Sequence, residues 1–590
     1  MTTRETTQTM TASSENTNDK PAVRLATLFN ALTKRKALAM FVLGFSSGLP
    51  YVLITGTMNA WFTNENVDIK TIGVFSWIII IYGFKFLWSP AVDRAPAPRL
   101  FSMGQRRAGI FLFQIIIIAA LAVIATASPQ SQIGLMALAA VLCTIAASSQ
   151  DVLIDAWRIE VADEETSIDL LSSVYQIGFR VAAILGGAGA LILAARIGWN
   201  DTFRLLAILM AFAVSGAFLA VDSPIANRNL NVDETAPPQR LRNLAITPVL
   251  LGWGWSFIAL FGFMAFALDR PGEANARVFT LQTGPLIVLA SVIAPVAVAA
   301  LLLRVTQSQG AHTADGLKDT APDTTPWPMQ RVFDVLYTSV LAPMIDIVQR
   351  LGPSAVLVLA LILSYRFTDL VWGAFAYPFY LGENFGALGH TNDEVAIASK
   401  LFGSLMTFAG ISLGAALVLK FGRMPSLFLG AVLAAATNLL FADLAQGGAL
   451  THGFMSATHL YGVFGVFQPL VDFLALDVTV DERLSRLMIV IAAENLSVGI
   501  ASAAIVVYLS SIANPKYAAV QYALFASLTM LIGSLGRGAL GELIELRGFA
   551  YVFYLTAALG GIAVLTTGLE WRRQSALKGS GDQSETVSTD

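Results

Sequence analysis

Long apolar segments recur along nearly the whole chain, and they constrain its fold more than any other feature. Many reach about 20 residues, the length that a helix needs to cross about 30 Å of hydrocarbon. Hydrophobic residues make up 55% of the chain and charged residues only 13%. The apolar runs are continuous and lack the alternating pattern of membrane β-barrel strands. The sequence therefore predicts an all-α polytopic membrane protein.

The expected spans fall into three groups along the chain. The N-terminal half, residues 38–221, contains six helices, near 38–62, 71–92, 107–127, 133–158, 168–195 and 202–221. An extra central pair within residues 247–303 follows, near 247–268 and 280–303. The C-terminal half, residues 354–571, contains six more helices, near 354–381, 394–420, 425–442, 485–511, 517–544 and 549–571. Six, two and six helices predict about 14 spans.

Polar segments separate these groups. Their low hydrophobicity and proline content are typical of chain that cannot bury a core. We expect a disordered cytoplasmic tail at residues 1–37 and a linker at 222–246. We also expect a cytoplasmic linker with an amphipathic helix at 304–353 and a second cytoplasmic tail at 572–590. The apolar part of an insertion at 443–483 is interrupted by Pro469 and Asp472, so we expect an interfacial or re-entrant helix there rather than a further span.

The distribution of charge predicts the orientation. Basic stretches at 34–36, 94–107 and 420–423 fall on one side of this arrangement, and the acidic stretches 65–68 and 383–394 fall on the other. Because Lys and Arg concentrate in cytoplasmic loops, both termini are expected to be cytoplasmic.

Composition also argues against several classes of function. The net charge of −3 gives no indication of a nucleic-acid partner. The single cysteine, Cys143, permits no intramolecular disulfide, and the four histidines, all at or beyond His312, have no ligand-like spacing for a metal. No GxGD-like motif of an intramembrane protease accompanies Asp369 or Asp472. We therefore expect neither an enzyme nor a bound cofactor.

The segment AASSQDVLIDAWRIE carries the most informative charges. Asp151, Asp155 and Arg158 are spaced i, i+4 and i+7, so they project from one helical face. Each charge at mid-bilayer costs about 2.5–3.5 kcal/mol on insertion scales, so this face requires partners, a water-filled cavity or the membrane interface. A polar path through the protein is the first hypothesis. Solvation of this helix end among the lipid headgroups is the alternative.

The loop after the second expected helix reads SPAVDRAPAPRLFSMGQRRAG. Its Asp93, Arg94, Arg106 and Arg107 resemble a stretched form of the major facilitator superfamily signature, a charge cluster that latches the two halves in one conformation. Lys420 to Arg423 resemble a degenerate copy in the other half, although ordinary cytoplasmic basic charge explains them equally well. Two related halves imply alternating access to a site near the membrane midplane.

A narrower resemblance follows from longer motifs. The strings GFSSGLPYVLITGTMNAWFTNENVDIKTIG, YGFKFLWSPAVDR and SSQDVLIDAWR are similar to the AmpG-type muropeptide permease family, as are YRFTD, AAENLSVG and AVQYALFASL in the second half. The resemblance implies a bacterial inner-membrane permease that imports anhydro-muropeptides from periplasm to cytoplasm with the proton gradient. The extra pair and the insertion at 443–483 lie outside these blocks.

A muropeptide offers carboxylates, amides and sugar hydroxyls, so its site should supply cations, amide side chains and aromatic faces. The candidates for substrate binding are Arg180, Gln176, Tyr175, Lys85, Trp157 and Arg366. Alternatives remain open for three of them. Arg180 could pair with Asp151 or Asp155, Lys85 could extend to the membrane interface, and Arg366 could pair with Asp369.

Proton coupling requires a carboxylate whose charge state changes with conformation. The candidates are Asp151, Asp155, Asp369 and Glu494, of which Glu494 has no basic neighbour one turn away. A different transporter of the same superfamily, such as a drug exporter or an acetyl-coenzyme A carrier, would keep this fold and lose the muropeptide substrate.

Overall fold

The computed structural model describes residues 34–85, 88, 92, 103–166, 168–222, 239–270, 273–310, 333–334, 337–473, 476, 478–514 and 518–586. Within these ranges every regular element is a helix. Most of the expected N-terminal tail, the segment 223–238 and the polar segment 311–332 lie outside the described residues.

The first group of helices forms the N-terminal bundle, residues 35–219. Its elements are α2 (Arg35–Val52), η1 (Leu53–Thr57), α3 (Met58–Asn64), α4 (Ile69–Phe75), η2 (Ser76–Ile79), α5 (Ile80–Gly83), α7 (Gln105–Thr126), α8 (Ile133–Glu160), α9 (Ile168–Ile184), η4 (Leu185–Gly189), α10 (Ala190–Ile197), α11 (Trp199–Ala213) and α12 (Ser215–Leu219). The extra pair follows as α13 (Gln239–Asp269), then α14 (Ala276–Gln282), α15 (Gly284–Val288), η5 (Leu289–Ile293) and α16 (Ala294–Gly310).

The remaining helices begin with η6 (Tyr337–Leu341) and α18 (Ala342–Leu351). The C-terminal bundle comprises η7 (Gly352–Ser354), α19 (Ala355–Tyr365), α20 (Phe367–Trp372), η8 (Gly373–Phe375), α21 (Ala376–Leu381), α22 (Asn392–Val395), η9 (Ala396–Phe402), α23 (Gly403–Phe421), α24 (Arg423–Ala445), α25 (Ala449–Ala457), α26 (Leu460–Gly465), α27 (Gln468–Phe473), α28 (Glu482–Ile512) and α29 (Ala518–Thr586).

Twelve helical segments among the described residues are long and apolar enough to cross a membrane. The chain is therefore an all-helical polytopic membrane protein, as its composition predicted. The segment Leu524–Leu577 contains two helices that meet at Gly548, whose φ of 78° breaks the helical path. The apolar helix Ile69–Gly83 is shorter than the other spans. About twelve candidate spans is the finding, and the count of 14 stays a prediction.

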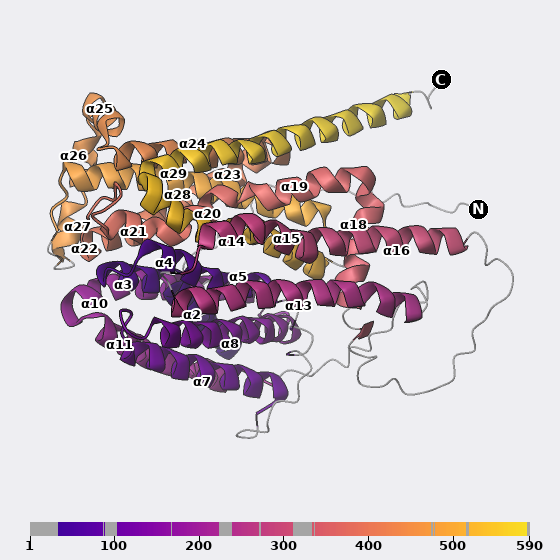
Figure 1. Cartoon of the computed structure of the whole chain (residues 1–590), viewed down its shortest axis with the longest axis horizontal. Helices are drawn as coiled ribbons and strands as arrows, with labels where there is room; N and C mark the ends of the chain where they lie inside the picture. Colours follow the sequence, from indigo (N-terminus) through magenta and orange to yellow (C-terminus); the bar gives the residue numbers. More distant parts are fainter. Residues whose placement is uncertain are drawn as a thin grey trace, which may run out of the picture.

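Figure 1 shows the spans running side by side, with α22, α25, α26 and α27 at one end and the termination of α16 and α29 at the other. We call the end with α22 and α25 to α27 the opposite end, and the end where α16 and α29 terminate the linker end. The three helices α25, α26 and α27 divide the insertion at 443–483 into pieces of six to nine residues, too short to cross a membrane. The rejection of a further span in this insertion therefore holds.

Two close helix crossings, one in each bundle, depend on glycine. A Cβ on Gly178 of α9 would collide with the carbonyl oxygen of Phe41 on α2. A Cβ on Gly410 of α23 would likewise collide with the backbone of Leu496 on α28. Because small residues let helix backbones approach closely, these glycines fix the α2–α9 and α23–α28 contacts.

Replacing Gly178 with alanine should therefore lower the thermal stability of the purified protein. We expect a destabilisation of about 1–3 kcal/mol, the usual cost of overpacking a closely packed contact. Gly134→Ala is the matched control, because no atom lies within 4 Å of a Cβ built on that helical glycine. Thermal unfolding in detergent measures both variants. Equal melting temperatures for the two would contradict the assigned packing.

Candidate functional site

Asp151 faces a polar cluster inside the N-terminal bundle. The Ser47 hydroxyl on α2 donates to Asp151 Oδ1 at 2.5 Å and lies 2.7 Å from the Tyr175 hydroxyl on α9. Lys85 Nζ lies 3.9 Å from Asp151 Oδ2, and only 14% of the Asp151 side chain is exposed. Asp151 thus has the polar partners that a membrane carboxylate requires, and Lys85 extends toward it.

The other charges of the same helix are arranged differently. Arg158 pairs with Asp155 at 3.0 Å, and its guanidinium lies 5.4 Å from the centre of the Tyr175 ring. Trp157 is completely buried, and its indole N–H donates to the Val221 carbonyl at 2.8 Å. The expected sugar-stacking role of Trp157 does not fit this conformation, because the ring packs in the core of the N-terminal bundle.

Arg180 of α9 lies where the two bundles meet. Its guanidinium is 5.0 Å from the centre of the Phe408 ring, which belongs to α23 of the C-terminal bundle. Within the described residues Arg180 has no acidic partner, so the pair with Asp151 or Asp155 that we considered is not formed. Gln176, one turn earlier, is exposed. A half-buried guanidinium held only by a ring face remains available to an anionic ligand.

In the C-terminal bundle, a break in the first span places another ion pair. Arg366, with φ −101° and ψ 11°, interrupts the helix between α19 and α20. Its guanidinium contacts Asp369 Oδ2 at 2.5 Å and donates to the Ser502 hydroxyl at 2.9 Å. This local pair is the alternative that the i, i+3 spacing allowed. Broken helices of this kind commonly line the central sites of transporters.

Glu494 occupies the middle of α28 and is half-buried. Among the described residues it has no hydrogen bond or ion pair. The charged side chains whose fields reach it are Asp369 and Lys400. A carboxylate with no fixed partner in a membrane span is suited to a change of protonation, because neither charge state is held by a strong local contact.

Lys400 is a site candidate that our sequence reasoning missed. It lies in the π-helix η9, its ammonium is 4.8 Å from the centre of the Tyr377 ring, and its side-chain stem packs at Gly187 of the N-terminal bundle. No acidic residue of the described chain forms an ion pair with it. The signal was present, since a single lysine in the apolar string AIASKLF meets the same criterion that selected Glu494.

Aromatic side chains lie near these charges. Tyr51 of α2 packs edge-on against Tyr82 at 5.1 Å between ring centres and against Phe179 at 5.9 Å. The buried hydroxyls of Tyr82 and Tyr377 have no hydrogen-bond partner in the described part of the chain. Rings with a free hydroxyl can both stack on a sugar and bond its hydroxyl groups.

The ion pairs that join the two bundles lie at the opposite end, as far as the described residues go. Arg196 binds Asp393 through two contacts of 3.1 and 3.2 Å, and Lys70 pairs with Glu545 at 2.6 Å. The Asn392 amide also donates to Asn64 at 3.0 Å. These contacts close the two bundles against each other at that end.

At the linker end, no described ion pair joins the N-terminal bundle to the C-terminal bundle. Arg106 pairs with Glu160 at 2.7 Å and Arg107 with Asp222 at 3.0 Å. The bonded Lys36 ammonium lowers the pKa of the Asp163 carboxyl in the same region. Arg106 thus pairs within the N-terminal half and Arg107 with the residue that directly follows it, and Asp93 and Arg94 lie outside the described residues.

Arg537 of α29 also connects the bundles and was not among our site candidates. Its side chain is 4% exposed, and its Nε donates to the Leu370 carbonyl at 2.8 Å. Nη1 reaches the Ser76 carbonyl of the N-terminal bundle at 3.4 Å, and the Trp77 indole donates to the Leu535 carbonyl at 3.1 Å. Together they hold η2 against α29, a contact between the bundles away from their ends.

Comparisons with known proteins agree with this arrangement. Two solved structures share the fold. A variant of the nucleoside transporter NupG matches with a TM-score of 0.51 and 12% identity, over 90% of this chain and 99% of that one. An auto-inhibited POT family peptide transporter matches with a TM-score of 0.52 and 13% identity, over 92% of this chain and 97% of that one. At this identity the likeness concerns the fold alone. The chain therefore has the major facilitator fold of these transporters.

Two curated transporter sequences are similar to this chain. The chain is 35% identical to the anhydromuropeptide permease of Escherichia coli K12 over 216 residues, which span 36% of this chain and 41% of that permease. It is 23% identical to the putative transporter AmpG 4 of Rickettsia felis over 89% of this chain and 94% of that protein. No family model matches the chain. The chain is therefore similar to AmpG-type transporters over most of its length.

Proposed function

We propose that this protein is a proton-coupled secondary transporter that imports anhydro-muropeptides from periplasm to cytoplasm by alternating access. One observation carries the proposal: Arg180 and Lys400 come from different bundles, each side chain contacts the other bundle, and neither has an acidic partner among the described residues. Two such cations in a membrane protein favour a substrate that brings negative charge. The name of the E. coli relative supports the substrate class.

The proposed architecture has 14 spans in a bacterial inner membrane. It consists of two six-helix halves at 38–221 and 354–571 with the extra pair at 247–303 between them. Both termini are cytoplasmic, so the linker end faces the cytoplasm. The basic stretches at the linker end and the acidic stretches at the opposite end support this orientation.

In this orientation the structure corresponds to a state closed toward the periplasm. The Arg196–Asp393 and Lys70–Glu545 pairs would have to separate before a substrate could enter from that side. Substrate carboxylates would then bind Arg180 and Lys400, tyrosines would contact the sugars, and protonation of Glu494 or the Asp151 region would accompany closure.

Breaking the periplasmic closure should shift the conformational equilibrium. Replacing Asp393 with Arg puts two like charges together, and we expect the outward-open population to rise by about tenfold or more. The combined Arg196→Asp and Asp393→Arg exchange should restore the original population. Distances between spin labels placed at the opposite end measure both. An unchanged distance distribution in the single variant would contradict the assigned closure.

Transport assays with defined ligands test the substrate class. Proteoliposomes containing the purified protein are offered labelled anhydro-muropeptide, acetyl-coenzyme A or a cationic drug, with protein-free vesicles as background. We expect uptake of the muropeptide alone. Uptake of one of the other two ligands, with no muropeptide transport, would select the alternative of a different major facilitator transporter.

A further inference from the structure

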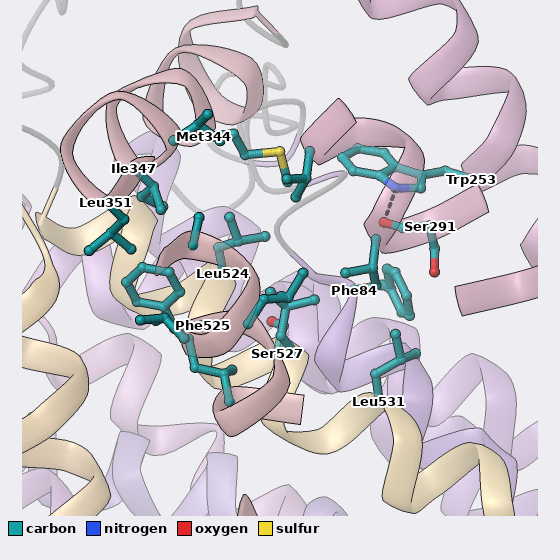
Figure 2. Close-up of a pocket in the computed structure, with 18 residues that line it drawn as sticks. Phe84, Trp253, Ser291, Met344, Ile347, Leu351, Leu524, Phe525, Ser527 and Leu531 are labelled. Atoms are coloured by element: carbon teal, nitrogen blue, oxygen red, sulfur yellow. Dashed lines mark hydrogen bonds between the residues drawn. The ribbon is translucent and has the colours of Figure 1, made fainter. Parts of the chain in front are cut away.

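An apolar cavity lies between the extra pair and the C-terminal bundle, away from the charged residues discussed above. The empty space within it is about 730 Å³, which includes the part that is open to the surroundings. Figure 2 shows Trp253 and Ser291 of the extra pair on one side, Met344, Ile347 and Leu351 of α18 on another, and residues of α29 between them. Side chains of α19 complete the wall. Three separate parts of the fold therefore enclose one space.

The chemistry of the wall excludes water as the natural occupant. Of the 18 residues that line the cavity, 16 are apolar or aromatic and only Ser291 and Ser527 carry a hydroxyl. The Ser291 hydroxyl already donates to the Ile287 carbonyl at 2.6 Å. The Trp253 indole N–H is bonded to the Ser291 carbonyl at 2.9 Å. Because a buried water needs two to four polar partners, this space does not suit ordered water.

The cavity is also partly open to its surroundings, so an occupant can enter it. Protein interiors are close-packed and contain few voids larger than a water molecule, because lining atoms without partners lose their dispersion contacts. The occupant should therefore be apolar and elongated enough to reach from α18 to η5 and α29.

The surroundings identify the source of that occupant. The same helices of the extra pair expose apolar side chains on their outer faces, including Leu251 at 69%, Ile258 at 75% and Leu289 at 48%. In a membrane-spanning helix such faces contact lipid, so acyl chains reach the rim of the cavity. Figure 1 places α18 across the linker end between α16 and α19, so the cavity that α18 borders lies toward that end of the protein.

We propose that the cavity binds one acyl chain of a bilayer phospholipid from the leaflet at the linker end. The chain fills the space between the extra pair and the C-terminal bundle and touches Leu359 and Ile362, which lie within two turns before the Arg366 break. The bound lipid thus acts as an apolar filler that joins the extra helices to the transporter. This inference is independent of the transported substrate.

A photoreactive lipid tests the proposal. The full-length protein is reconstituted into vesicles of phosphatidylethanolamine and phosphatidylglycerol that contain a phosphatidylethanolamine with a diazirine near the end of one acyl chain. Peptide mass spectrometry then locates the labelled residues. We expect Met344, Leu524 and Leu528 to be labelled about tenfold more per residue than the lipid-facing Leu251 and Ile258. Equal labelling of the two sets would overturn the proposal.

Filling the cavity provides a second test. Val292→Trp places a large ring in the space and should remove the labelling of Met344, Leu524 and Leu528, while Leu251→Trp, on the lipid-facing side of α13, should leave it unchanged. If Val292→Trp does not yield folded protein, Ser291→Leu replaces it with the same expectation. Labelling that persists in a folded, filled variant, or that an excess of anhydro-muropeptide displaces, would assign the signal to another site or another occupant.

Discussion

Replacing Arg180 with alanine is expected to raise the KM for anhydro-muropeptide uptake by about thirtyfold or more. This is the effect of about 2 kcal/mol or more that follows the loss of one member of a desolvated charge pair. The prediction rests on a guanidinium that contacts only the Phe408 ring and has no acidic partner among the described residues. Uptake by proteoliposomes at several substrate concentrations measures KM.

The Arg180→Lys variant separates binding from simple charge. Lysine keeps the positive charge but lacks the planar fork that binds a carboxylate through two hydrogen bonds, so we expect it to be impaired as well. Arg204→Lys on α11 is the matched control, because Arg204 is 58% exposed and pairs with Asp201 in its own helix. Normal affinity in Arg180→Lys, at unchanged protein level, would show that this arginine does not bind the substrate carboxylate.

Replacing Glu494 with glutamine should uncouple transport from the proton gradient. A membrane potential of 100 mV supplies about 2.3 kcal/mol for each charge, enough for about fiftyfold accumulation, and we expect the variant to lose this accumulation. Exchange of labelled for unlabelled substrate across the membrane should persist, because glutamine keeps the size and polarity of the side chain. The absence of any ion pair to Glu494 in the described chain motivates the choice of residue.

Glu482→Gln, on the same helix but 67% exposed, is the control and should accumulate substrate normally. The double variant Asp151→Asn with Asp155→Asn examines the second candidate for coupling. If Glu494→Gln accumulates substrate as the parent does, the coupling carboxylate lies elsewhere. Loss of exchange together with accumulation would instead give Glu494 a role in binding or structure.

The spans were predictable because hydrocarbon imposes a minimum length on a helix. The runs near 247–268 and 280–303 coincide with α13 and with α14 to α16, and the kink at Gly548 lies between the expected helices 517–544 and 549–571. The break at Arg366 was not predicted. Neither proline nor glycine marks it in the sequence YRFTD, so local chemistry gave no sign of an interruption.

The site was predictable in part for a related reason. A charge that cannot face lipid has to point inward, and Asp151 indeed contacts Ser47 rather than the outer surface. Helical periodicity could not distinguish a tryptophan in the core from one in a cavity wall, and in this structure Trp157 is completely buried. The Arg196–Asp393 pair joins residues 197 positions apart, and no local pattern specifies such a contact.

Proton-coupled import is tested most directly by the accumulation of labelled anhydro-muropeptide in proteoliposomes with and without an imposed proton gradient. We predict uptake above the equilibrium level only when protons flow in the same direction as the substrate, and loss of that excess when a protonophore dissipates the gradient. Uptake that never exceeds equilibrium, or that is unaffected by the gradient while the protein is folded and correctly inserted, would contradict it.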